Sequence, residues 1–75
     1  MTHDNNLIRM ANQIGTFFES MPDRQEALEG IATHLKKFWD PRMRQAFLAQ
    51  VEGAQHPDIR EIVLAAVRAH RTLIA

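Results

Sequence analysis

A chain of 75 residues is long enough for one small domain, expected to span residues 1–75. A domain of that size buries only about 60% of the surface of its unfolded chain, so its stability is expected to be marginal. The absence of cysteine excludes disulfides, zinc–thiolate sites, protein-ligated iron–sulfur clusters and cysteine nucleophiles. Nine bases balance nine acids, so no net charge draws the chain onto nucleic acid or an anionic membrane.

The charges cancel overall but are uneven along the sequence. Residues 1–29 hold five acids and two bases, whereas residues 30–75 hold four acids and seven bases, a difference that could steer a docking orientation. The longest apolar run, Ile62 to Val67, is far shorter than the roughly 18 residues that a membrane span needs. The first residues lack the basic and apolar regions of a secretory signal, so we expect a cytoplasmic protein.

The first helix is predicted from about Asn5 to Ser20. Its apolar residues follow the three-four spacing of one helix face: Leu7, Met10, Ala11, Ile14, Phe17, Phe18 and Met21. Asp4 or Asn5 can cap it, and Pro22 helps to end it.

A second helix is predicted to begin at Asp23, with Glu26 completing a capping-box pattern. Its apolar residues cover a broad arc, which favours packing against more than one neighbour at the centre of the fold: Ala27, Leu28, Ile31, Ala32, Leu35, Phe38 and Trp39. Asp40 and Pro41 then provide an N-cap and a first-turn proline for a third helix.

The third helix is predicted to carry apolar residues from Met43 to Val51 and to end at Gly53 with a positive φ. A fourth helix is predicted to open with Pro57 in its first turn and to bury one apolar face, in which His70 is the polar exception. No strand pattern competes. The fold class is therefore all-α, a compact bundle of about four short helices joined by Pro/Gly turns.

No catalytic, cofactor-binding or metal site is predicted. Ser20, the only serine, has no histidine at a helpful spacing, and the four histidines (His3, His34, His56 and His70) form no ligand pattern. Gly15, Gly30 and Gly53 are isolated, so they do not form a phosphate loop; close helix packing explains better the two that fall inside helices.

The segment from Phe38 to Arg44 is the richest in chemistry. In this segment the second helix ends, Asp40 caps the third helix, and the third helix begins at Pro41. Phe38 and Trp39 are expected in the core. Arg44 falls inside the apolar arc of the third helix, where a charge must reach water or find a partner. Trp and Arg dominate protein–protein hot spots, so we predict partner docking by Trp39, Arg42 and Arg44.

Two alternatives to docking through this turn remain open. If the turn is only structural, the interface is expected on the outer faces of the first and fourth helices, where Ile8 and Leu64 lie off the apolar stripe. The second alternative is a small basic patch that binds nucleic acid, formed by Arg42, Arg44, Lys36 and Lys37. This hypothesis is weaker because Asp40 lies among these bases.

Several strings of residues resemble a known family. They are Met10 to Gly15 with Phe17 and Phe18, then Pro22-Asp23, then Ile31 to Leu35, and finally Phe-Trp-Asp-Pro-Arg-Met-Arg from Phe38 to Arg44. Together they resemble the delta subunit of cytosolic NAD-dependent, molybdenum-containing formate dehydrogenases. The resemblance covers about residues 7–51, with a looser match in the last helix.

The resemblance implies a small, non-catalytic accessory subunit of a formate dehydrogenase complex. In such complexes the alpha subunit holds molybdopterin guanine dinucleotide and iron–sulfur clusters, and other subunits hold further clusters, FMN and the NAD site. None of these cofactors is expected on this chain, which has no thiolate for a cluster. Its expected partner is the catalytic alpha subunit, with no nucleic acid and no membrane.

The leading hypothesis is therefore a subunit that docks on the complex and stabilises it or helps to assemble it. One alternative is a transient maturation factor that binds the catalytic subunit while the molybdenum cofactor is inserted. A second is a free-standing helical domain that regulates or binds nucleic acid. Steeply salt-dependent binding to DNA or RNA would distinguish the second alternative.

Overall fold

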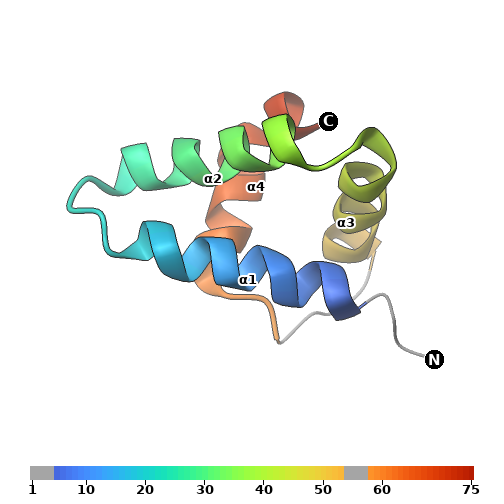
Figure 1. The fold of residues 1–75 in the computed structure, drawn as a ribbon, viewed down its shortest axis with the longest axis horizontal. Coiled ribbons are helices and arrows are strands. Elements are labelled where there is room, and N and C mark those ends of the chain that lie inside the picture. Colours follow the sequence, from blue (N-terminus) through green and yellow to red (C-terminus); the bar gives the residue numbers. More distant parts are fainter. Residues whose placement is uncertain (1–4, 54–57) are drawn as a thin grey trace.

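The computed structural model describes residues 5–53 and 58–75, which form four helices. They are α1 (Asn5–Glu19), α2 (Arg24–Phe38), α3 (Pro41–Gly53) and α4 (Glu61–Ile74). The described residues contain no strand, so the predicted all-α class is confirmed (Figure 1). Within the same ranges, no helix has the length and apolar character to cross a membrane.

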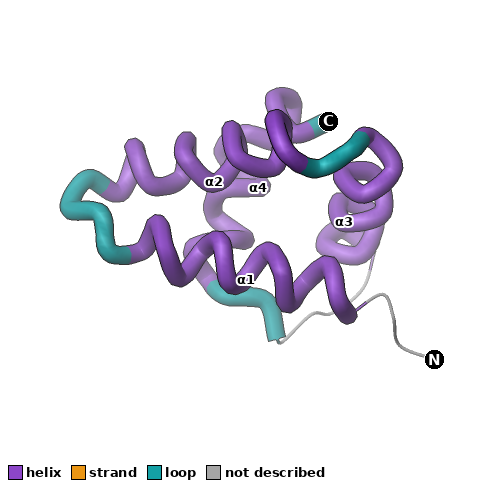
Figure 2. Tube along the Cα trace, in the orientation of Figure 1, coloured by secondary structure: helices purple, strands orange, loops and turns teal. Residues whose placement is uncertain are grey.

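The helices are arranged as a hairpin with two helices packed across it. Figure 1 shows α1 and α2 running side by side in opposite directions, with α4 behind them and α3 at one end. Short loops, teal in Figure 2, connect α1 to α2 and α2 to α3. The predicted packing of α2 against more than one neighbour is confirmed, because it contacts both α1 and α4. Its contact with α4 is the most extensive between any two helices, and α4 also contacts α1 and α3.

The core lies where α1, α2 and α4 meet, and α3 closes one end of it. Its largest fully buried side chains are Phe47, Ile31, Leu35, Leu48, Ile74 and Val63. Small residues separate these large ones: Ala11, Ala27, Ala32 and Ala66 are all fully buried. Ile8, predicted to lie off the apolar stripe, is only 5% exposed and belongs to the core, which corrects that prediction.

Both predicted aspartate caps are present. Asp23 Oδ1 accepts hydrogen bonds from the backbone N–H groups of Gln25 (2.9 Å) and Glu26 (3.2 Å) at the start of α2. Asp40 Oδ1 accepts one from the N–H of Met43 (2.9 Å), directly after Pro41 opens α3. Each carboxylate satisfies amide groups that the helix itself leaves free, and this fixes where the helix begins.

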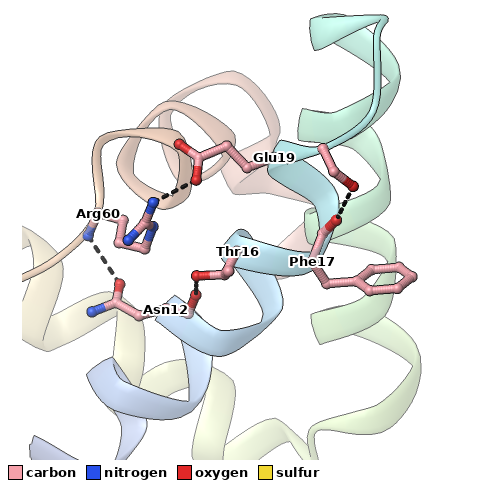
Figure 3. Close-up of polar contacts among 6 residues, drawn as sticks. Asn12, Thr16, Phe17, Glu19 and Arg60 are labelled. Carbon is pink, nitrogen blue, oxygen red and sulfur yellow. Dashed lines mark hydrogen bonds and ion pairs between the residues drawn. The ribbon is translucent and has the colours of Figure 1, made fainter.

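The predicted start of α4 is wrong by four residues, and Asn12 explains why. The helix begins at Glu61. Arg60 occupies the N-cap position, but its side chain makes no capping hydrogen bond. The Asn12 side chain acts instead: its Nδ2 donates to the Asp58 carbonyl (2.7 Å) and its Oδ1 accepts from the Arg60 N–H (2.9 Å). Figure 3 shows the Arg60 bond, with the Arg60 guanidinium also paired to Glu19. This tie holds residues 58–60 against α1 in a non-helical path; Pro57 lies outside the described residues.

Two other predictions for the helix ends need correction. Gly53 closes α3 as predicted, but its φ is not positive, so Gly53 itself is not a left-handed residue. In the last turns of α4, His70 has φ −130° and ψ 33°, which is not helical and marks a kink that the apolar pattern does not predict.

Three ion pairs link α4 and the residue before it to the other helices. Arg24 pairs with Glu61 (2.6 Å), Arg60 with Glu19, and Arg71 with Glu52. Each joins residues far apart in the sequence, and all six side chains are largely in water, so each pair adds little to stability. The Arg71 guanidinium, by hydrogen bonding, lowers the pKa of the Glu52 carboxyl below its usual value.

Gly15 and Gly30 both lie at close contacts, as predicted, but the atoms that approach them belong to side chains and not to the backbone of a crossing helix. A Cβ on Gly15 would lie 2.6 Å from Val63 Cγ2, and one on Gly30 would lie 2.5 Å from Cε1 of Phe18. Gly15 therefore sets how closely α1 approaches α4. Gly30 provides the flat surface on which the Phe18 ring rests.

Gly15→Ala is expected to lower stability even though alanine favours helices. The added methyl meets the stiff, fully buried Val63, and overpacking of about 1–3 kcal/mol outweighs the gain of about 1 kcal/mol in helix propensity. Urea denaturation followed by circular dichroism measures the effect.

Two further variants complete this test. Gly53→Ala is the control, because no atom of the described residues lies within 4 Å of the new methyl group. In a Val63→Ala background, Gly15→Ala should raise stability instead of lowering it. A Gly15→Ala protein as stable as wild type would contradict the close α1–α4 contact.

Candidate docking surface

The predicted docking residues divide between the interior and the surface. Trp39 is 6% exposed and Arg44 is 8% exposed, whereas Arg42 lies in water. The Trp39 ring meets Phe47 edge-on at 5.6 Å between ring centroids. Arg44 Nη1 donates to the carbonyl of Ile74 at 2.9 Å. Trp39 and Arg44, which flank Arg42 in the sequence, are thus both buried, whereas Arg42 itself is exposed.

Arg44 closes the end of α4. The last carbonyl groups of a helix lack partners within the helix and carry partial negative charge, so a guanidinium there is favourable in both respects. Within residues 5–53 and 58–75, the buried Arg44 Nε has no hydrogen-bond partner, and no acid pairs with Arg44. This cap connects the α2–α3 turn to the end of the described chain. It also removes Arg44 from the surface basic patch considered for nucleic acid.

Phe38 was predicted to lie in the core, and that prediction is wrong: 71% of the residue is exposed. The cause lies in the next residue. Trp39 leaves the helix with extended backbone angles (φ −94°, ψ 135°), and its ring takes the inward position beside Phe47. Two successive large side chains cannot both point inward here, so Phe38 stays outside on the last turn of α2.

An apolar groove of about 480 Å³ lies between α1 and α2, next to this turn. It is lined by Met10, Gln13, Ile14, Phe17, Phe18, His34 and Trp39. Phe17 was predicted on the apolar stripe of the first helix, yet it is 72% exposed. Figure 3 shows its ring projecting from α1 away from Arg60. Trp39 forms the floor of the groove as well as part of the core.

Four aromatic rings run in series along this face. Phe17 and Phe18 meet at right angles (5.1 Å between centroids), Phe18 faces the His34 ring at 6.5 Å, and His34 lies 4.8 Å from Phe38. We call the groove together with the exposed rings of Phe17 and Phe38 the aromatic face. A soluble monomer rarely exposes such a contiguous apolar surface unless it meets a partner.

The aromatic face is not among the surfaces predicted from the sequence, although two signals in the sequence point to it. Neighbouring helical residues point about 100° apart, so Phe17 and Phe18 cannot share one direction. The second signal is Gly30, which was assigned to a helix crossing and instead accommodates the ring of Phe18.

The alternative interface on the outer faces of the first and fourth helices has little support. Ile8 on α1 is buried, and Leu64 on α4 is half-buried.

The remaining candidates show no reactive arrangement. Ser20 Oγ donates to the carbonyl of Phe17 at 3.0 Å, where it helps to end α1. No group of three or more His, Cys, Asp or Glu residues in the described ranges is placed to hold a metal ion. His70 is half-buried at the kink of α4, beside a small pocket that Gln25, Leu28 and Glu29 also line.

Comparison with known families decides the identity. The model of the NADH-dependent formate dehydrogenase delta subunit family, FdsD, matches residues 6–67. The chain belongs to this family. The match to the delta subunit family spans α1 to α3 and the first half of α4, and so includes every residue of the turn and of the aromatic face. A search of curated proteins found no match, and neither did a search of solved structures.

Truncation of the two arginines of the turn is expected to affect folding unequally. Arg44→Ala leaves the Ile74 carbonyl without its donor and opens a gap, so we expect unfolding to become easier by about 1–3 kcal/mol. Arg42→Ala removes an exposed side chain and should change stability by less than about 0.5 kcal/mol. Thermal denaturation of the two variants checks this. Equal losses would show that Arg44 does not cap α4.

Proposed function

We propose that this chain is a non-catalytic accessory subunit of an NADH-dependent formate dehydrogenase. It docks on the other subunits and stabilises the complex or helps to assemble it. Membership of the delta subunit family over residues 6–67 is the observation that carries this proposal. The proposal places the chain in the cytoplasm with the rest of the complex, as the resemblance implied.

The structure supports docking through two properties. A domain of this size has a thin core, so it gains stability from a partner. It also exposes Phe17 and Phe38, apolar side chains that a partner would remove from water. We propose the catalytic alpha subunit as the partner. The molybdopterin cofactor, iron–sulfur clusters, FMN and NAD would then all be held by other subunits.

Docking by Trp39, Arg42 and Arg44 remains a prediction, and the structure gives each residue a different part in it. Arg42 can reach a partner directly because its side chain is exposed. Trp39 and Arg44 would act from inside, by holding the turn in one conformation before binding. A turn fixed in this way loses little conformational entropy when it binds.

A permanent subunit and a transient maturation factor differ in what the mature enzyme contains. We expect a tagged copy of the chain, expressed in its native host, to purify with active formate dehydrogenase in a fixed molar ratio. Quantitative mass spectrometry of the active fraction measures that ratio. A chain found only with cofactor-free catalytic subunit would establish the maturation factor instead. Failure to purify with any formate dehydrogenase subunit would refute docking altogether.

A further inference from the structure

We propose that the aromatic face binds one particular kind of segment. This segment belongs to another subunit of the complex and carries large apolar side chains flanked by acidic residues. The inference rests on the proposed function, which it deepens by naming the surface and the chemistry of its occupant. It differs from the prediction that the α2–α3 turn docks, because the groove itself shares only Trp39 with the turn, and Arg42 lies at its rim.

The groove suits apolar side chains from a protein. Its volume of about 480 Å³ accommodates bulky side chains, and five of its seven lining residues have apolar or aromatic side chains. The exposed rings of Phe17 and Phe38 extend the apolar surface beyond it. Burial of such rings against a partner is favourable by about 25 cal/mol for each Å² removed from water.

The polar groups of the groove are few, and they fit a peptide better than a nucleotide. Of the described residues that line it, Gln13 and His34 are polar, and Trp39 adds one indole N–H. A side-chain amide both donates and accepts, so Gln13 can bond the backbone of a bound segment. A phosphate would need converging N–H groups or several cations inside the groove, and the lining residues provide neither.

Unpaired bases lie around the end of the groove that adjoins the turn. Arg9, Lys37 and Arg42 are exposed, and none belongs to the three ion pairs of the described structure. Helical spacing places Arg9 beside Gln13, four residues on, and Lys37 beside His34, three residues back.

The described acids near this end are fewer than the bases. The Asp40 carboxylate caps α3 but keeps its negative charge, so it offsets one of the three bases. On α2, Glu26 lies on the same row as His34 but two turns away, beyond Gly30. Among the residues that the structure describes, the charge around the turn end of the groove is therefore positive.

This charge selects the occupant. A second copy of the chain, docked face to face with its groove parallel to this one, would bring these bases toward the same bases of its partner, and like charges repel. A segment with acidic residues beside its apolar ones would pair with Arg9, Lys37 and Arg42 while its apolar side chains fill the groove. Such pairs at the rim mainly govern the rate and specificity of association, whereas the apolar contacts supply the affinity.

The test measures binding of the purified chain to formate dehydrogenase complex prepared without it. Phe17→Ser and Phe38→Ser are each expected to weaken binding about tenfold or more, as for other hot-spot residues. Leu73→Ser is the matched control, because Leu73 is an exposed apolar residue of α4 outside the groove, and it should bind like wild type. The three replaced side chains are exposed, so circular dichroism should show the same helical fold in every variant.

A second pair of variants tests the acidic flank. Lys37→Glu should weaken binding about threefold at low salt, and the difference should vanish at high salt as the charges are screened. Arg68→Glu, a change at an exposed base on α4, is the control and should have no such effect. A photoreactive residue placed at Gln13 should cross-link to a segment of another subunit that contains acids within one turn of large apolar residues.

The outcomes separate the two proposals. If the wild-type chain does not bind the complex, the proposed function fails. If it binds, and the phenylalanine variants bind equally well, the aromatic face is not the docking surface although the function stands. A cross-link to a second copy of the chain, or to a segment without acids, overturns the proposed occupant.

Discussion

The close approach of α4 to the α1–α2 hairpin is the constraint on which the rest of this structure depends. Small residues make it possible: Gly15 faces Val63 directly, and buried alanines lie on α1, α2 and α4. With so few large core residues, the domain cannot compensate elsewhere for a separation of these helices. The same approach leaves the opposite side of the hairpin uncovered by any described helix (Figure 1), and the groove lies on that side.

Features that depend on neighbouring residues could be predicted from the sequence. The caps at Asp23 and Asp40 and the restart at Pro41 involve contacts within three residues, and all are present. The start of α4 could not be predicted, because it depends on Asn12, which is 48 residues from its partner Arg60.

The exposure of Phe38 and Phe17 was missed for a related reason. An apolar pattern indicates which residues favour burial, but not which of two adjacent rings obtains the interior position. Trp39 obtains it beside Phe47, a residue of another helix, so the outcome is set by tertiary packing. The distribution of charge along the sequence did not predict the ion pairs either. Glu19 from the acidic part of the sequence pairs with Arg60 from the basic part. Of the bases outside the three ion pairs, Arg9, Lys37 and Arg42 come from three different helices.

Two exposed phenylalanines on a chain with zero formal net charge have a consequence for its behaviour in the cell. Proteins near zero net charge lack the mutual repulsion that keeps molecules apart, and apolar surface then promotes association and precipitation. Free chain in excess of its binding sites would therefore be lost to aggregation, not stored. The amount of usable chain is then limited by the amount of partner present, and the two need to be synthesised in step.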